Sequence, residues 1–112
     1  MKRIIAIVRP EKMEPLKEAL LAADVSGVTV GQVTGCGNQH GWKEYYRGSE
    51  MLLNMVKNVK FELVVADSKV EGLIDLICDV AATGEVGDGK VFVSPVEEVV
   101  RIRTRERGEK AV

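Results

Sequence analysis

Residues 83–90 form a glycine-rich stretch, TGEVGDGK, whose residue types suit the binding of an anion. Gly87 and Gly89 can adopt a positive φ and carry no Cβ, so successive backbone N–H groups can converge on one phosphate. Asp88 lies between the two glycines, and Lys90 adds a positive charge at the end of the stretch. The other interpretation is a short turn that only joins a helix to a strand, because Gly-Asp-Gly turns are common where a chain reverses.

Two further polar features could complete such a site. Arg101 and Arg103 would project from one face of a strand, and each guanidinium can grip phosphate oxygens through two parallel N–H bonds. The second feature is residues 35–39, Gly-Cys-Gly-Asn-Gln. If the fold brings these features and the glycine turn together, they describe a polyphosphate site. Taken alone, the arginine pair is more typical of a solvated strand face.

The sequence lacks the residues of an enzyme site or of a zinc site. His40 is the single histidine and has no serine or cysteine partner in a nucleophile motif. Glu50, Glu62 and Asp88 belong to three different segments, and no Cys/His spacing supports zinc. The sequence therefore predicts a binding protein with no catalytic residue.

Composition limits the function classes further. The 112 residues are 46% hydrophobic and 29% charged, which suits one domain, residues 1–112, with one core. A net charge of -1 gives no basic field, which argues against nucleic-acid binding. Cys36 and Cys78 are too few and too far apart for a metal motif, so we expect reduced thiols in a cytoplasmic protein, with Cys78 in the core. Neither a membrane span nor a signal-peptide pattern is seen.

Hydrophobic periodicity predicts an α+β domain with elements in the order βαββαβ, the arrangement of ferredoxin-like folds. A capping box of Ser68 and Glu71 should start the second helix, and Gly31 is typical of either a bulge or a close approach by another backbone. The predicted strands are 4–8, 28–33, 59–65, 91–93 and 100–104, the last two forming the final β unit; the helices are 12–23 and about 68–84; and a polar, frayed tail covers about 105–112.

A long loop, residues 37–55, separates the second and third strands of this scheme. It shows no clear period and contains Trp42, Tyr45 and Tyr46. Connections longer than about 12 to 15 residues are usually functional or disordered. Two interpretations stay open: the aromatic residues pack locally at a hairpin tip, or they dock into a partner. We expect the loop to be mobile until a ligand or partner orders it.

Residues 83–93, TGEVGDGKVFV, resemble the C-terminal signature of the PII family of nitrogen-signalling proteins. The resemblance extends to residues 101–104, RIRT, and residues 46–50, YRGSE, look like the mobile T-loop of that family. The loop base Gly35-x-Gly37-x-Gln39 also matches, so the similarity covers nearly the whole chain.

This resemblance implies a homotrimer of ferredoxin-like subunits with ATP or ADP in each of three clefts between neighbours. Arg101 and Arg103 would reach the phosphates. The family also binds 2-oxoglutarate beside Mg-ATP, where Gln39 helps to hold the metal and the keto acid. The residues implied to bind the nucleotide from one subunit are Thr29, Gly37, Asn38, Gln39, Glu62, Val64, Gly87, Asp88, Gly89 and Lys90.

The resemblance also implies that partners bind the T-loop through Trp42, Tyr45, Tyr46, Arg47 and Ser49. An ammonium transporter is the first candidate partner, because a long cationic side chain such as Arg47 could plug a narrow pore. Glutamine synthetase is the second. Such a protein would be cytoplasmic and would reach the membrane only through the transporter. Ser49 could be phosphorylated, as in some relatives.

Two residues depart from the family pattern. Met51 stands where the family often has a nucleotidylated tyrosine, so that modification is impossible there. Asn58 stands where a lysine commonly pairs with the 2-oxoglutarate carboxylate, with Lys57 and Lys60 nearby. We therefore expect 2-oxoglutarate to bind with reduced affinity, and an adenylate-ratio sensor without a 2-oxoglutarate response stays open.

Two other functions share the predicted topology. An RNA-binding domain would need stacking aromatics along its strands, a pattern that residues 57–62 lack. A small ferredoxin-like phosphatase would need a catalytic constellation, and none is evident.

Overall fold

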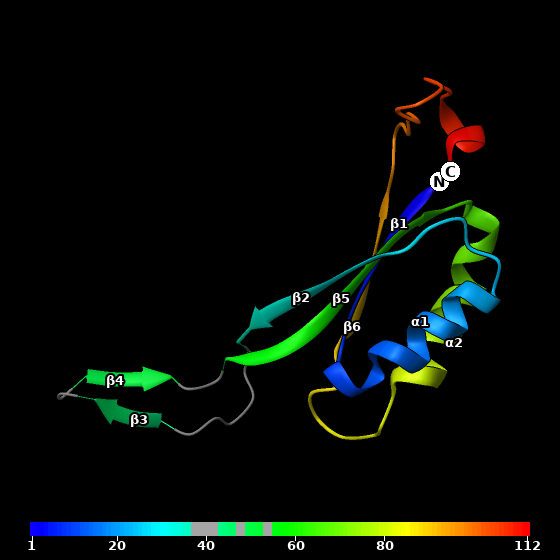
Figure 1. The fold of residues 1–112 in the computed structure, drawn as a ribbon. Helices are drawn as coiled ribbons and strands as arrows, with labels where there is room; N and C mark the ends of the chain where they lie inside the picture. The colour runs from blue at the N-terminus through cyan, green and yellow to red at the C-terminus, as the bar shows by residue number, and fades with distance from the viewer. Residues whose placement is uncertain (37–42, 47–48, 53–54) are drawn as a thin grey trace.

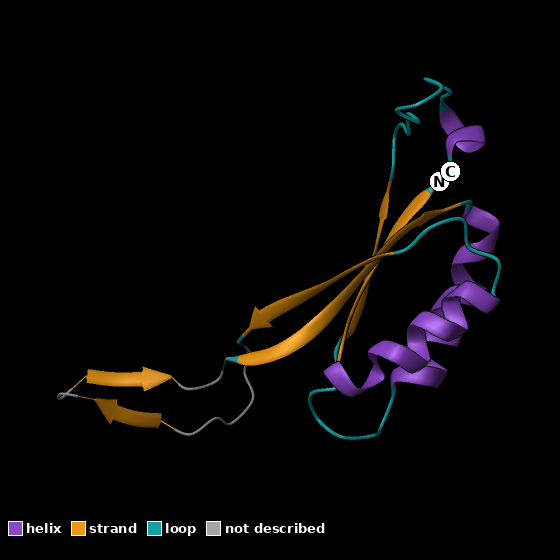
Figure 2. Cartoon of the chain, in the orientation of Figure 1, coloured by secondary structure: helices purple, strands orange, loops and turns teal. Residues whose placement is uncertain are grey.

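The structure is a computed structural model that describes residues 1–36, 43–46, 49–52 and 55–112 (Figure 1). Its main sheet has four antiparallel strands in the order β2-β5-β1-β6. Figure 2 shows the two α-helices together on one side of this sheet. The α+β, ferredoxin-like fold predicted from the sequence is therefore confirmed. The strands are β1 (Lys2–Val8), β2 (Thr29–Gly35), β5 (Val56–Val65) and β6 (Lys90–Pro95), and the helices are α1 (Met13–Ala22) and α2 (Val70–Ala81).

Alternating residues of the central strands form the core. In β5 every second residue from Val59 to Val65 is buried, and in β1 the same holds from Ile4 to Val8. This period of two is what a sheet with one covered face requires. The helices add residues at spacings of three and four, which place them on one helical stripe. The buried core is Ile4, Ala6, Val8, Leu16, Leu20, Val59, Phe61, Leu63, Val65, Val70, Leu73, Ile77 and Ala81.

The opposite face of the sheet is not covered by either helix. Strand register aligns the residues of this face in rows, one of which runs Thr29, Glu62, Ile5 and Phe92 across the four strands. Phe92 is 52% exposed. We call this surface the open face.

The helix starts differ from the sequence prediction. A 3₁₀ turn, η2 (Asp67–Lys69), precedes α2, and neither N-cap residue makes a side-chain capping bond. The predicted capping box of Ser68 and Glu71 is therefore wrong, because both residues already lie inside helical turns. A second 3₁₀ turn, η1 (Pro10–Lys12), precedes α1.

Cys78 is exposed, so its predicted place in the core is wrong. Leu73, Ile77 and Ala81 form the buried stripe of α2 at spacings of four. Cys78 follows Ile77 by one residue, which is about 100° around the helix, and so it lies beside the stripe.

The predicted bulge at Gly31 is also absent from the sheet. Gly31 pairs with Lys60 within an unbroken ladder from Thr29↔Glu62 to Gly35↔Val56. The ladder also explains why β5 begins at Val56, before the predicted start.

The C-terminal segment is not the predicted strand followed by a frayed tail. Val100 bridges to Arg107, and the chain between them turns back with Arg105 at φ 62°. The Arg105 N–H donates to the Arg101 carbonyl at 2.7 Å, and the Arg101 N–H donates to the Glu106 carbonyl at 3.0 Å. The chain then forms η3 (Gly108–Ala111). These hydrogen bonds replace the extended backbone that the Val/Ile alternation predicted.

The region predicted as an aperiodic loop contains a hairpin. Strands β3 (Lys43–Tyr46) and β4 (Ser49–Leu52) pair antiparallel from Lys43↔Leu52 to Tyr46↔Ser49. Within the parts of the chain given above, no helix has the length and hydropathy needed to cross a membrane.

Candidate functional site

The glycine turn after α2 has the backbone that the sequence predicted. Gly87 and Gly89 have φ of 102° and 103°, and Gly84 has φ of 87°. This left-handed region is open to glycine and strained for most other residues. The predicted positive φ at Gly87 and Gly89 is therefore confirmed.

Gly89 also lies against the end of β1. A Cβ built on Gly89 would stand 1.7 Å from the Ile7 carbonyl oxygen. Only glycine allows this approach, which holds the glycine turn against the central strand.

One carboxylate organises the first half of the turn. Asp88 Oδ2 accepts from the backbone N–H of Thr83 at 2.7 Å and of Gly84 at 3.0 Å. Asp88 Oδ1 accepts from the Thr83 hydroxyl and from Arg9 Nε, the latter at 2.9 Å. These donors, Thr83 first and then Arg9, hold the pKa of Asp88 far below its ordinary value. Asp88 was expected among the nucleotide-binding residues, but its carboxylate is occupied within the turn.

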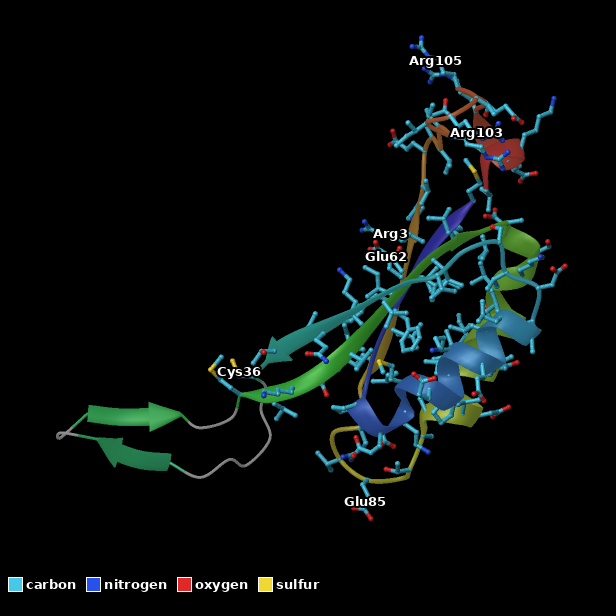
Figure 3. All side chains as sticks on the ribbon, in the orientation of Figure 1. Arg3, Cys36, Glu62, Glu85, Arg103 and Arg105 are labelled. Atoms are coloured by element: carbon cyan, nitrogen blue, oxygen red, sulfur yellow. The ribbon has the colours of Figure 1, made fainter. Side chains whose placement is uncertain are left out.

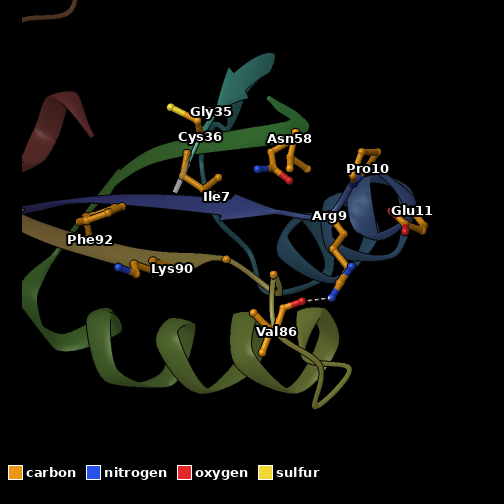
Figure 4. A pocket seen from close by; sticks show the side chains of 13 residues that line it. Ile7, Arg9, Pro10, Glu11, Gly35, Cys36, Asn58, Val86, Lys90 and Phe92 are labelled. Carbon is orange, nitrogen blue, oxygen red and sulfur yellow. Dashed lines mark hydrogen bonds between the residues drawn. The ribbon is translucent and has the colours of Figure 1, made fainter. Parts of the chain in front are cut away.

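Arg9 was not singled out from the sequence. Its Nη2 donates to the Val86 carbonyl at 2.9 Å, the contact drawn as a dashed line in Figure 4, while its Nε binds Asp88. Arg9 follows β1 directly, so only the strand register, which places the end of β1 beside the turn, could have revealed this role. The Arg-Pro pair that ends β1 gives no such signal.

A cavity of about 520 Å³ lies beside the turn (Figure 4). Gly87, Gly89 and Lys90 line it from the turn, and Gly35 and Cys36 line it from the end of β2. Two of the three polar features predicted to converge, the glycine turn and the start of segment 35–39, are therefore together. Its other lining residues are Ile7, Arg9, Pro10, Glu11, Val56, Asn58, Val86 and Phe92.

The arginine pair does not join them within one chain. Strand β6 runs away from the turn, and after Pro95 the Val96 N–H donates to the Met1 carbonyl at the far end of the sheet. Figure 3 shows Arg103 beyond that end and Glu85 of the turn at the opposite end. Arg101 lies 3.6 Å from a carboxylate oxygen of Glu106 and donates to the Lys110 carbonyl. Convergence of the three features within a single chain is therefore wrong, because the turn precedes β6 and the arginine segment follows it, at the opposite end of the sheet.

Thr29, Glu62 and Val64 lie on the open face and do not line the cavity. Thr29 is opposite Glu62, and Val64 is opposite Arg3 in the next row toward the chain ends. Glu62 lies 3.9 Å from the ammonium of Lys60, one row nearer to the cavity.

Asn58, which replaces a lysine of the family pattern, lines the cavity. Lys57 does not line this cavity, because alternate residues of β5 face opposite sides; it lines a second hollow, which Asn58 also borders. Lys60 shares the face of Asn58 but pairs with Glu62.

Several expected site residues lie outside the described parts of the chain, namely Gly37, Asn38, Gln39, Trp42 and Arg47. Gln39 was the residue expected to hold Mg. Tyr45, Tyr46, Ser49 and Met51 fall on the hairpin strands β3 and β4.

Comparison with known proteins assigns the chain to a family. The family model described as nitrogen regulatory protein P-II matches residues 1–106. A nitrogen regulatory protein P-II of Microchaete diplosiphon is 49% identical over 112 residues, all of both chains. The nitrogen regulatory protein P-II 2 of Methanothermobacter thermautotrophicus is 50% identical over all of this chain and 97% of its own length. With the ferredoxin-like fold and the preset glycine turn, these matches show that this chain belongs to the nitrogen regulatory protein P-II family.

Proposed function

We propose that this protein is a signalling protein that binds ATP or ADP in the cavity at the glycine turn and controls partner proteins through residues 37–55. The proposal rests on the backbone conformation of the glycine turn. Its left-handed glycines border a cavity of about 520 Å³ together with Lys90 and the end of β2. The relatives are named as regulatory proteins, which supports a role in signalling over catalysis.

The backbone of Gly87 and Gly89 and the ammonium of Lys90 would hold the phosphates. Lys90 is exposed at the cavity, and the described residues offer it no ion pair. Its charge is therefore available to an anion, whereas Arg9 is paired with Asp88. Phosphate bound by backbone N–H groups and one point charge is a common arrangement in glycine-rich loops.

A homotrimer would complete the site. Arg101 and Arg103 lie at the end of the sheet opposite the turn, so they would reach the phosphates only on a neighbouring subunit. The open face offers an apolar contact surface for such a neighbour, with Ile5 and Phe92 adjacent across β1 and β6. Partly exposed apolar surface of this kind is typical of subunit interfaces.

We propose two further ligands: Mg bound together with ATP, and 2-oxoglutarate bound beside the Mg-ATP. The metal would neutralise phosphate charge and coordinate the keto acid, with Gln39 as its protein contact. Asn58 supplies an amide in place of an ammonium at the cavity, and Lys57 faces away. We therefore expect 2-oxoglutarate to bind with reduced affinity and only in the presence of Mg-ATP.

The hairpin segment would carry the signal to a partner. An ammonium transporter is the first candidate and glutamine synthetase the second, with Arg47 and neighbouring aromatic residues as the contact. Ser49 offers a phosphorylation site, whereas Met51 offers no hydroxyl for nucleotidylation.

Calorimetric titration with ATP and with ADP tests the nucleotide site. Lys90→Ala should weaken ATP binding by about tenfold or more, since a charge-assisted contact contributes about 1.5–3 kcal/mol. Lys69→Ala, which removes an exposed lysine that donates to the Asp24 carbonyl, is the control. Equal affinity in both variants would contradict the assignment, and turnover of ATP or acyl phosphates would favour the phosphatase.

Titration of 2-oxoglutarate with Mg-ATP, with Mg-ADP and with neither tests the second ligand. Heat should appear with Mg-ATP alone and grow in Asn58→Lys. No binding in either protein would leave an adenylate-ratio sensor.

A further inference from the structure

Asp88 stands inside the glycine turn at a place where its charge would repel a nucleotide. It follows Gly87 and precedes Gly89, and both glycines line the cavity proposed to hold phosphates. A carboxylate beside a polyanion weakens binding by charge repulsion, so its presence in the turn calls for a different role. The contacts of Asp88 show what that role is.

The Asp88 carboxylate has little capacity left for a ligand. Oδ1 accepts from the Thr83 hydroxyl and from Arg9, and Oδ2 accepts from the N–H groups of Thr83 and Gly84. Two carboxylate oxygens offer about four acceptor positions, so these donors fill the group. The side chain is also only 24% exposed.

We propose that Asp88 is a positioning residue, which holds the turn in its binding geometry through Thr83 and Arg9 and does not itself touch the nucleotide or its metal. This inference rests on the proposed nucleotide site. It replaces direct ligand contact by Asp88, the role expected from the sequence.

Thr83 extends the effect of Asp88 along the turn. Its hydroxyl has one proton, which is donated to the ionised Asp88, so its oxygen is free to accept from the Glu85 N–H at 3.2 Å. Three consecutive backbone N–H groups, those of Thr83, Gly84 and Glu85, are thus fixed by one carboxylate and one hydroxyl.

Arg9 fixes the turn to the sheet. Its guanidinium binds Asp88 through Nε and the Val86 carbonyl through Nη2, both at 2.9 Å. The Gly89 backbone meets the Ile7 carbonyl beside it. The second half of the turn, which carries Lys90 into β6, is therefore held in place before any ligand arrives. Pre-organisation of this kind lowers the entropy lost on binding.

The direction in which one substitution changes ATP affinity separates a positioning role from simple charge repulsion. Asp88→Asn keeps the shape and removes a negative charge near the phosphates, so electrostatics alone predicts tighter ATP binding. Its amide oxygen can accept from either Arg9 or the backbone donors, not both, and the charged Arg9 is the stronger donor. The backbone N–H groups should therefore lose their acceptor, the turn should loosen and ATP binding should weaken. Glu85→Gln makes the same charge change on an exposed side chain that Figure 3 shows pointing away from the turn. It is the matched control.

Thr83 provides a second, independent comparison. Thr83→Val removes the hydroxyl at nearly constant shape, and Thr83→Ser keeps it. If Asp88 touched the ligand directly, Thr83→Val would leave ATP affinity nearly unchanged. If Asp88 positions the turn, Thr83→Val should weaken ATP binding, Thr83→Ser should restore it, and the double variant with Asp88→Asn should be no weaker than Asp88→Asn alone.

The experiment has a ligand-free arm and an ATP arm on the full chain. Amide hydrogen exchange without nucleotide should show lost protection at Thr83 and Gly84 in Asp88→Asn, with Glu85→Gln unchanged. Calorimetry should show ATP binding weakened about tenfold or more in Asp88→Asn, in keeping with the loss of charge-assisted hydrogen bonds. Unchanged amide protection, or ATP binding that is unchanged or tighter in Asp88→Asn, would overturn the positioning role. Wild-type protein that takes up no ATP would contradict the nucleotide site first, before any variant is compared.

Discussion

Gly89 is a residue whose identity the structure restricts tightly. A Cβ at this position would meet the Ile7 carbonyl oxygen at 1.7 Å, and the backbone has φ of 103°. Gly89→Ala should therefore lower stability by about 3 kcal/mol or more, because left-handed strain alone costs about 1–3 kcal/mol. Urea denaturation midpoints at fixed protein concentration measure the change.

Gly72→Ala is the matched control for that substitution. Gly72 lies within α2, and a Cβ there would meet nothing within 4 Å. Alanine in a helix interior is about 1 kcal/mol better than glycine, so this variant should be more stable than the wild type. Equal destabilisation by both substitutions would contradict the close approach at Gly89.

Asp88 should also make stability depend on pH in a predictable direction. Hydrogen bonds from Thr83, then from Arg9, lower its pKa in the folded protein below the ordinary 3.8. A lowered pKa stabilises the folded state above pH of about 4, and this stabilisation is lost as pH falls below that value. The wild type should therefore melt above Asp88→Asn at neutral pH, and the difference should shrink in acid. A difference that is constant with pH would show that the charge of Asp88 contributes nothing.

At the scale of elements, the end of β2 and the glycine turn form one site. Cys36 lines the cavity directly after β2, and Cys78 lies exposed on α2 outside its lining. Saturating ATP should slow alkylation of Cys36 about tenfold at a nucleotide concentration near ten times Kd, because only ligand-free protein reacts. Cys78 should react at the same rate throughout. Mass spectrometry of the two labelled peptides gives both rates, and an unprotected Cys36 would place the nucleotide elsewhere.

The elements most fully predicted were those with a strict hydrophobic period. The alternation from Val59 to Val65 predicted β5. Residue type alone, and not a period, predicted the positive φ of Gly87 and Gly89. The strand predicted at 100–104 was wrong because the same alternation fits a segment whose backbone hydrogen bonds are satisfied by a turn with Arg105 at φ 62°. The strands β3 and β4 were not predicted because four residues carry no clear period, although a hairpin tip was one of the two interpretations of this loop.

Residue contacts between distant segments could not be predicted. Arg9 and Asp88 are 79 residues apart, and their ion pair at 2.9 Å depends on where β1 ends relative to the turn. Sequence reasoning placed Cys78 on the apolar stripe of α2 because a thiol counts as hydrophobic, although its neighbour Ile77 takes the buried position.

At the scale of the whole molecule, the two halves of the proposed phosphate site lie at opposite ends of one sheet. The turn with Lys90 is at the Ile7 end of β1, and the segment with Arg101 and Arg103 follows the Lys2 end. A monomer therefore cannot place both on one nucleotide. Light scattering should report a trimer, and a monomer with full ATP affinity would contradict the account.

Mixing two defective chains tests this central claim most directly. Lys90→Ala leaves the arginines intact, and Arg101→Ala with Arg103→Ala leaves the turn intact, so each pure variant should bind ATP weakly. In trimers reassembled from an equal mixture, about one quarter of the interfaces would pair an intact turn with intact arginines of a neighbour. We predict that calorimetry on the mixture recovers wild-type affinity at about that fraction of sites. A mixture that binds no more ATP than the separate variants would contradict a nucleotide site shared between subunits.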